Sequence, residues 1–207
     1  MLFRSALGGD SPDPKTAGEI GRLLASGAGA DEPTADAAAA VADLFARLFR
    51  RADPVYPPHI HVRRQLAEGT VSGPVADALA NALRTRVELV RADHEELDEA
   101  GTGHSAVDAV GRTMIAVFRR FYNPRWTLVS AVSHSGRSAI TGALAGAVLG
   151  ARYGSPGLPA DWLHQLPLRD LTATVADDAF WHFSAHPPLA DHRYAAEWAT
   201  RYPRDPR

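Results

Sequence analysis

The segment richest in groups that could bind a ligand is the polar run 133–138, Ser-His-Ser-Gly-Arg-Ser. It leads directly into an apolar segment with glycines at positions 142, 146 and 150. Four-residue spacing places these glycines on one face of a helix, where a neighbouring backbone can approach closely. The polar run then precedes the N-terminus of that helix, whose dipole favours an anion. The pattern predicts an anion-binding loop in which Arg137 can pair with a phosphate or carboxylate.

Two other clusters have residue types that suit a metal ion or an enzyme of another kind. His59 and His61 could offer two imidazoles to zinc only in an extended segment and only with a third ligand. Because segment 55–62 contains prolines, we expect it to be a loop, with the histidines in solvent. The acidic run 93–99 is metal-like in composition, but on a helix its side chains fan around the axis, as at a solvated helix end.

The composition argues against several classes of protein. The chain has 207 residues, a formal net charge of −2 and no cysteine. Near-neutral charge argues against a nucleic-acid partner, and the absence of cysteine excludes disulfides and thiolate metal sites. The N-terminal ten residues lack the apolar run of a signal peptide, and the longest apolar run, 139–151, is shorter than the roughly 20 residues that span a bilayer. We expect a cytoplasmic protein with no membrane partner.

The elements that would position these residues are helices. Apolar residues recur at helical spacing in segments 41–49, 75–90 and 107–121. A helix is also expected to begin at Asp13-Pro14, where the aspartate can cap the first turn. Shorter helices are expected over 126–133, 139–152, 159–166, 170–183 and 191–202. With no repeat or low-complexity linker, the pattern predicts one all-α domain covering residues 1–207.

Segment 133–150 resembles the metal loop and following helix of the ADP-ribosylglycohydrolase family, including the dinitrogenase-reductase-activating glycohydrolases. In that family the loop reads His-Ser-Gly-Asp-Ser-Asp-Ser/Thr-Thr-Gly-Ala. The similarity is strongest over residues 103–203, where the "Pro-Ala-Asp-Trp" segment at 159–162 and the "Trp-Ala-Thr-Arg-Tyr-Pro" segment at 198–203 also resemble the family. More faintly, Asp31–Ala35 falls where the family has a motif that opens a helix. The resemblance implies a compact orthogonal helical bundle.

The sequence departs from the family at the residues that would bind metal. The resemblance implies two Mg²⁺ ions held by carboxylates and a hydroxyl group. This chain has Arg137 and Ala139 in place of the two aspartates, and Ile140 in place of the hydroxyl residue. Magnesium requires oxygen ligands, so we expect no metal and no other cofactor. The family's acidic N-terminal motifs also have no counterpart here, which predicts a degenerate, N-terminally truncated member.

The first functional hypothesis is a pseudoenzyme that binds an ADP-ribose-like or other phosphate-bearing small molecule without cleaving it. The residues expected to bind it are His134, Ser135, Gly136, Arg137, Ser138 and His104. The structural alternative for Arg137 is a surface arginine that caps the helix or pairs with a nearby acid such as Asp108.

Three other hypotheses remain open from the sequence. The chain could bind a protein partner or form a homodimer, acting as a regulatory subunit or helical scaffold, because aromatic and arginine anchors suit an interface. The candidate anchors are Phe118, Phe121, Tyr122, Arg125, Trp126, Phe180 and Trp181. It could also be an active hydrolase of the same family with a divergent, metal-independent site, or an enzyme of another kind. The sequence leaves catalytic residues unassigned.

Overall fold

The computed structural model describes residues 13–49, 56–85, 93–182 and 186–203. In these ranges every regular element is a helix and there is no strand, which confirms the predicted all-α class. The chain divides into two compact units, the first ending at Pro159 and the second beginning at Ala160. Whether the two fold as the single domain expected from the sequence stays a prediction.

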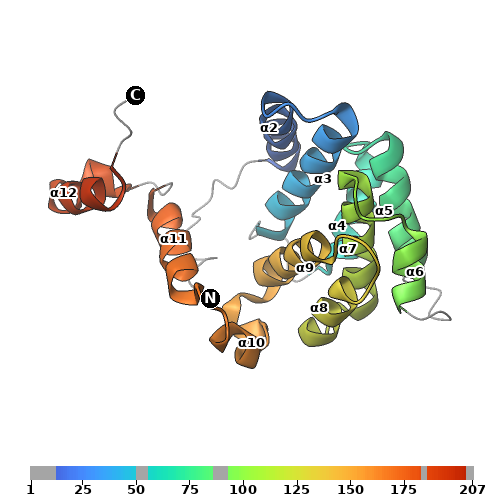
Figure 1. Ribbon diagram of the computed structural model, residues 1–207. Coiled ribbons are helices and arrows are strands. Elements are labelled where there is room, and N and C mark those ends of the chain that lie inside the picture. The colour runs from blue at the N-terminus through green and yellow to red at the C-terminus, as the bar shows by residue number, and fades with distance from the viewer. Residues whose placement is uncertain (1–12, 50–55, 86–92, 183–185, 204–207) are drawn as a thin grey trace. The chain divides into compact units, whose positions relative to one another are not determined.

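The first unit is built around one central helix. Its elements are α2 (Pro14–Gly27), α3 (Glu32–Phe49), α4 (Pro58–Glu68), α5 (Gly73–Thr85), α6 (Asp93–Glu99), α7 (Ala106–Arg120), α8 (Pro124–Val132), α9 (Ser138–Tyr153) and the 3-10 turn η1 (Ser155–Gly157). Helix α7 packs against α3, α4, α5, α6, α8 and α9 (Figure 1). Every residue from Ala109 to Phe118 is buried, so α7 has no solvent-facing side over those turns.

Each expected helical segment of the first unit coincides with a helix, although α3 begins at Glu32, nine residues before the expected segment 41–49. Leu44 and Leu48 of α3 and Val110, Met114 and Val117 of α7 all enter the core. The predicted helix over 75–90 is described as far as Thr85, and its last residues lie outside the described ranges. The periodicity of apolar residues was therefore a reliable guide to the core-facing helices.

The prediction for segment 55–62 was wrong, because α4 begins at Pro58. Proline is well suited to the first turn of a helix, where its missing N–H has no partner to lose. The two histidines are buried, with His59 7% and His61 2% exposed. Side chains two residues apart on a helix are rotated by about 200° around its axis and point to nearly opposite sides. His59 and His61 therefore cannot form the zinc pair that an extended segment would allow.

Helices α2 and α3 pack closely through small residues. A Cβ at Gly21 would lie 2.8 Å from the Cβ of Ala42, and one at Gly18 would lie 3.3 Å from the carbonyl oxygen of Ala39. Helix α3 opens where Asp31 accepts a hydrogen bond of 3.0 Å from the backbone N–H of Thr34. This start coincides with the segment expected to open a helix.

The three glycines of α9 have different surroundings. Gly142 faces the side chain of Val132, Gly146 lies near Leu128, and no atom lies within 4 Å of a Cβ built on Gly150. The absence of a side chain at Gly142 and Gly146 therefore leaves space for side chains of α8. The close approach of a neighbouring backbone, expected from the spacing, does not occur at these positions.

Aromatic rings and an ion-pair network join the last two α-helices of the second unit. It contains α10 (Ala160–His164), α11 (Arg169–His182), the 3-10 turn η2 (Pro188–Ala190) and α12 (His192–Arg201). Trp181 of α11 and Trp198 of α12 meet edge to face, with centroids 5.6 Å apart. Asp178 of α11 accepts hydrogen bonds from Arg201, at 3.0 and 2.8 Å, and from the hydroxyl of Tyr202, at 2.9 Å.

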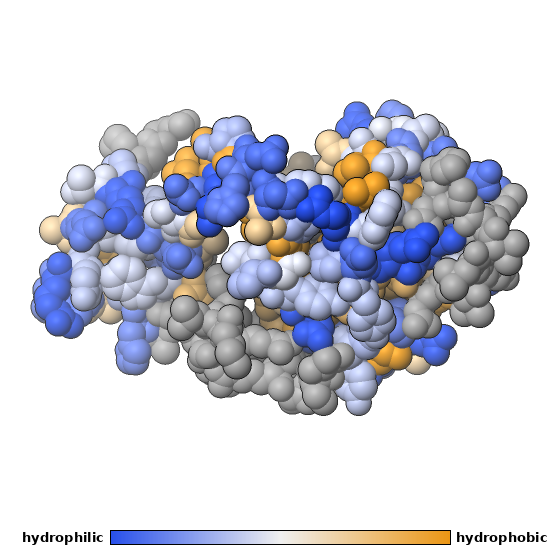
Figure 2. Space-filling model, turned by 90° about the horizontal axis from the view of Figure 1, so that it is seen from below, coloured by the Kyte–Doolittle hydropathy of each residue, from blue (hydrophilic) through white to orange (hydrophobic). Residues whose placement is uncertain are grey.

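The surface is mixed in polarity. Figure 2 shows hydrophobic residues in separate patches among hydrophilic ones on the face that it presents. Large exposed apolar side chains occur on α2 (Leu23 and Leu24) and on α11 (Leu171 and Val175). None of the described helices combines the length and apolar character needed to cross a membrane.

Candidate functional site

The polar loop between α8 and α9 is anchored by Arg112, a buried arginine in the middle of α7. The side chain of Arg112 has no exposed surface. A charge in such a place requires partners for its five N–H donors, because an unpaired buried charge is strongly destabilising. The partners come from α6 and from the loop itself.

Each nitrogen of the Arg112 guanidinium has an acceptor nearby. Nε donates to the carbonyl of Leu97 at 2.6 Å. Nη1 donates to the carbonyl of Ser135 at 2.6 Å, and Nη2 donates to Oδ1 of Asp98 at 3.1 Å. Arg112 thus ties the C-terminal end of α6 to the loop that precedes α9.

Asp98 and Ser135 form the second link between α6 and the loop. Oδ1 of Asp98 accepts from the hydroxyl of Ser135 at 2.6 Å and from its backbone N–H at 3.0 Å. The Ser135 hydroxyl, helped by its N–H and by the charge of Arg112, holds the pKa of the Asp98 carboxyl below its usual range. This carboxylate is therefore ionised at neutral pH and its Oδ1 is already engaged.

His134 lies with its ring between the loop and Arg112. Its Nδ1 is 2.9 Å from Nη1 of Arg112 and 2.6 Å from the carbonyl oxygen of Ser135. Because arginine only donates, Nδ1 accepts from Arg112 in one tautomer and donates to Ser135 in the other. The opposite nitrogen, Nε2, is buried and has no hydrogen-bond partner among the described residues.

A second loop, 101–105, packs directly against the first. Gly136 has φ +94°, and a Cβ built there would collide with the carbonyl oxygen of Thr102. Gly103 has φ +71°, and a Cβ there would be 3.6 Å from the backbone nitrogen of Arg137. Both glycines have a positive φ that other residues rarely adopt, and at Gly136 there is also no room for a Cβ, so this contact between the loops depends on glycine.

Arg137 and Ser138 stand at the N-terminus of α9. The Arg137 carbonyl accepts the N–H of Ile140 at 3.2 Å, and the Ser138 N–H donates to the carbonyl of Gly136 at 2.9 Å. The side chain of Arg137 is exposed and makes no capping hydrogen bond. The side chain of Arg137 therefore does not cap α9, which was the first of the two structural roles considered for it.

The pairing of Arg137 with Asp108 does not occur either. Asp108 instead accepts the backbone N–H of Thr102 at 3.2 Å, within the neighbouring loop. His104 lies in that loop with an exposed side chain, and its backbone N–H donates to Oγ1 of Thr102 at 3.4 Å. The six residues expected to bind a ligand thus lie on two adjoining loops, whose contact is made at Gly103 and Gly136.

The residues at this site do not fit a pair of magnesium ions. Ala139 and Ile140, in the first turn of α9, are exposed and offer no side-chain oxygen, and Arg137 brings a positive charge. The nearby Asp98 has its Oδ1 engaged with Arg112 and Ser135. Across the described ranges there is no group of three or more His, Asp or Glu side chains that could hold a metal ion. Magnesium needs several oxygen ligands in octahedral geometry, which this loop does not supply.

Sequence reasoning missed Arg112 and assigned Asp98 only to a solvated acidic run. A signal was present for the first: Arg112 interrupts a stretch of α7 that is otherwise apolar or small, and a charge in a buried helix needs a partner. The partners themselves are 14 to 23 residues away in the chain, so only the packing of α6, α7 and the loop identifies them.

The chain was compared with known proteins. A sequence model of the ADP-ribosylglycohydrolase family matches residues 1–189. No curated protein and no solved structure matches the chain.

Proposed function

Because the chain belongs to the ADP-ribosylglycohydrolase family, we propose that it is a non-catalytic member whose paired loops bind an ADP-ribose-like anion without magnesium. The proposal concerns the surface formed by segments 102–104 and 134–138. Its expected ligand carries phosphate groups, and its expected role is recognition or regulation.

The observation that carries the proposal is the position of Arg137, which is the N-cap residue of α9 and is exposed. At the N-terminus of a helix the dipole and a guanidinium have charges of the same sign. Two like charges at one place favour an anion that neutralises both, and a phosphate can accept two guanidinium N–H groups at once. The exposed imidazole of His104, on the adjoining loop, adds a further donor near the same surface.

The charge of the loop also opposes the family's metal-assisted reaction. In a hydrolase of this kind, metal ions would orient the ribose and the attacking water. Replacing carboxylates by Arg137 and Ala139 removes the negative charge that offsets a dication. We therefore derive no hydrolytic step at this site.

Isothermal titration calorimetry with ADP-ribose tests the proposal. Wild-type protein is expected to bind in the presence of EDTA, and Arg137→Ala is expected to bind at least about tenfold more weakly, as for loss of a charge-assisted hydrogen bond. The matched control is Arg63→Ala, which removes the same charge from an exposed position on α4 and should leave binding unchanged. No heat with wild type, or equal losses in both variants, would contradict the proposal.

A second candidate function is a protein-binding or homodimer surface at the turn between α7 and α8. Tyr122 and Trp126 are 77% and 59% exposed there, whereas Phe118 and Phe121 are buried at 4% each. Exposed aromatic residues are typical anchors of interfaces. Light scattering of wild type and of Trp126→Ser distinguishes the cases: a dimer that the variant dissociates supports this surface, and a monomer at all concentrations contradicts homodimerisation.

A further inference from the structure

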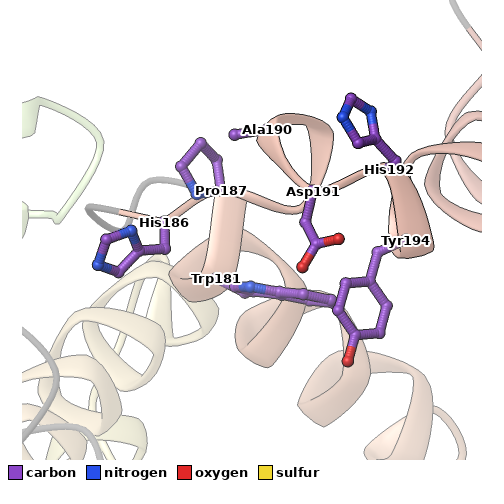
Figure 3. Close-up of a pocket in the computed structure, with 7 residues that line it drawn as sticks. All are labelled: Trp181, His186, Pro187, Ala190, Asp191, His192 and Tyr194. Atoms are coloured by element: carbon purple, nitrogen blue, oxygen red, sulfur yellow. The ribbon is translucent and has the colours of Figure 1, made fainter.

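The second unit contains a cavity of about 450 Å³ at the start of α12. Figure 3 shows its walls: the indole of Trp181 and the ring of Tyr194 on one side, Pro187 and Ala190 on the other, with the carboxylate of Asp191 directed toward the aromatic rings. The imidazoles of His186 and His192 complete the lining. Its volume lies in the range of small-molecule sites, which are mostly apolar with a few placed polar groups. This site belongs to a different unit from the loops described above.

The aromatic wall is rigid. Trp181 meets Tyr194 edge to face at 4.9 Å and Trp198 at 5.6 Å between centroids, so its ring is held by neighbours on α12. Rings fixed in this way offer an electron-rich face without the entropy cost of ordering a mobile side chain.

Asp191 supplies a negative charge beside these rings. Its carboxylate accepts from Nε of Arg193 at 3.1 Å and from Nη2 at 2.7 Å, and its Oδ1 accepts the backbone N–H of Arg193 at 3.0 Å. These hydrogen bonds, the side-chain ones first, hold the pKa of Asp191 below its usual range. The carboxylate is therefore charged at neutral pH.

The same side chain that pairs with Asp191 also lies over an aromatic ring. The guanidinium carbon of Arg193 is 5.5 Å from the centroid of Tyr194. A cation is thus already held beside the cavity by a carboxylate and a ring together, in a side chain that is 79% exposed and does not line the cavity. Because an exposed ion pair of this kind contributes little to stability, Arg193 can be displaced at small cost.

We propose that this pocket binds a small organic nitrogen cation, with its charge against Asp191 and its apolar surface against Trp181 and Tyr194. A cation in the cavity gains from both the carboxylate and the aromatic faces. Arg193, which pairs with Asp191 from outside the cavity, competes with that cation for the carboxylate. This inference goes beyond the function proposed above and does not depend on it.

Calorimetric titration of the full chain with choline and with methylguanidinium tests the proposal. 3,3-Dimethyl-1-butanol, the uncharged analogue of choline, is the control ligand. Wild type should bind at least one of the two cations and should not bind the neutral analogue. Arg193→Ala should bind the cation about two- to fivefold more tightly, because the competing ion pair is worth up to about 1 kcal/mol.

Two further variants locate the effect. Asp191→Asn retains a residue that caps α12 well but removes the charge, and should weaken cation binding at least about tenfold. Arg169→Ala removes the same charge as Arg193→Ala from another part of this unit, and should leave the affinity unchanged. The proposal is overturned if neither wild type nor Arg193→Ala binds a cation, or if the neutral analogue binds as tightly. The Arg193→Ala measurement decides even if Asp191→Asn fails to fold.

Discussion

In each unit an arginine–aspartate pair joins two helices, and the two pairs differ in which member is buried. In the first unit the side chain of Arg112 is 0% exposed and that of Asp98 is 41% exposed, whereas in the second that of Arg201 is 43% exposed and that of Asp178 is 11% exposed. Arg112 bridges α6 and the loop before α9, and Arg201 bridges α12 and Asp178 of α11. The buried arginine of the first pair fixes the shape of a loop, and the half-exposed arginine of the second supplements aromatic packing.

The two helices that carry the buried members of these pairs, α7 and α11, also differ in how much of each helix is buried. Helix α7 is buried on all sides over ten residues, while in α11 only Asp178 is buried. Removing Arg112 would empty a fully buried site and leave buried carbonyls without donors, whereas removing Arg201 would empty a half-exposed site and leave the Tyr202 hydroxyl as a donor to Asp178. The comparison predicts that equivalent substitutions have unequal effects in the two units.

The largest effect is expected from Arg112→Ala. It leaves a cavity and removes the donors of the carbonyls of Leu97 and Ser135, and should lower the free energy of unfolding by about 3–5 kcal/mol, as for truncation of a large buried side chain. The matched variant Arg201→Ala should cost clearly less, because its guanidinium is 43% exposed and the Tyr202 hydroxyl still donates to Asp178. Urea denaturation followed by circular dichroism measures both. Equal losses would remove the distinction between the pairs.

Trp198→Ala is expected to have the next largest effect, confined to the second unit. The indole of Trp198 contacts the rings of Trp181, His182 and Tyr202, and truncating a buried tryptophan costs about 3 kcal/mol or more. Limited proteolysis should then cleave within residues 160–203 and spare the first unit. Cleavage of both units at the same rate would indicate that they unfold together, as the single domain expected from the sequence would.

Gly136→Ala is expected to cost about 1–3 kcal/mol through a positive φ and the clash with Thr102. The control within the same region is Gly150→Ala, where a Cβ meets no atom within 4 Å and the change should stabilise the helix by up to about 1 kcal/mol. Thermal unfolding measures both. If Gly136→Ala leaves the stability unchanged, the loops 101–105 and 133–138 do not require their present contact.

The smallest effect is a pH dependence. The pKa of Asp98 is lowered by Ser135, and that of Asp178 by Arg201. A lowered carboxyl pKa gives stability that is present above the unfolded pKa of about 3.9 and is lost as the pH falls through the folded value. Asp98→Asn and Asp178→Asn should therefore destabilise at pH 7 and should differ less from wild type in acid. Urea denaturation at pH 7 and pH 3 checks this, and a difference as large at pH 3 as at pH 7 would contradict it.

Local patterns in the sequence predicted most of the helices but not the contacts between them. Helical spacing of apolar residues located α3 and α7, and the family resemblance located the loop 133–138. Helix α4 was missed because Pro57 and Pro58 were interpreted as breaking structure, although proline at a first turn begins a helix.

The network beneath the site could not be derived in this way. The contact of Gly136 with Thr102, and those of Arg112 with Asp98 and Ser135, depend on how three segments distant in the chain pack together. Spacing along the sequence carries no information about such contacts. A charge within an apolar helix predicts only that a partner exists.

The central claim is that the site of this family member recognises its ligand without metal-assisted cleavage. The most direct measurement is release of ADP-ribose from an ADP-ribosyl-arginine substrate, followed with millimolar Mg²⁺ and with EDTA. We expect no turnover in either condition, while ADP-ribose itself still binds. Release that depends on Mg²⁺ would contradict the proposed role, and release in EDTA would instead identify a hydrolase with a metal-independent site.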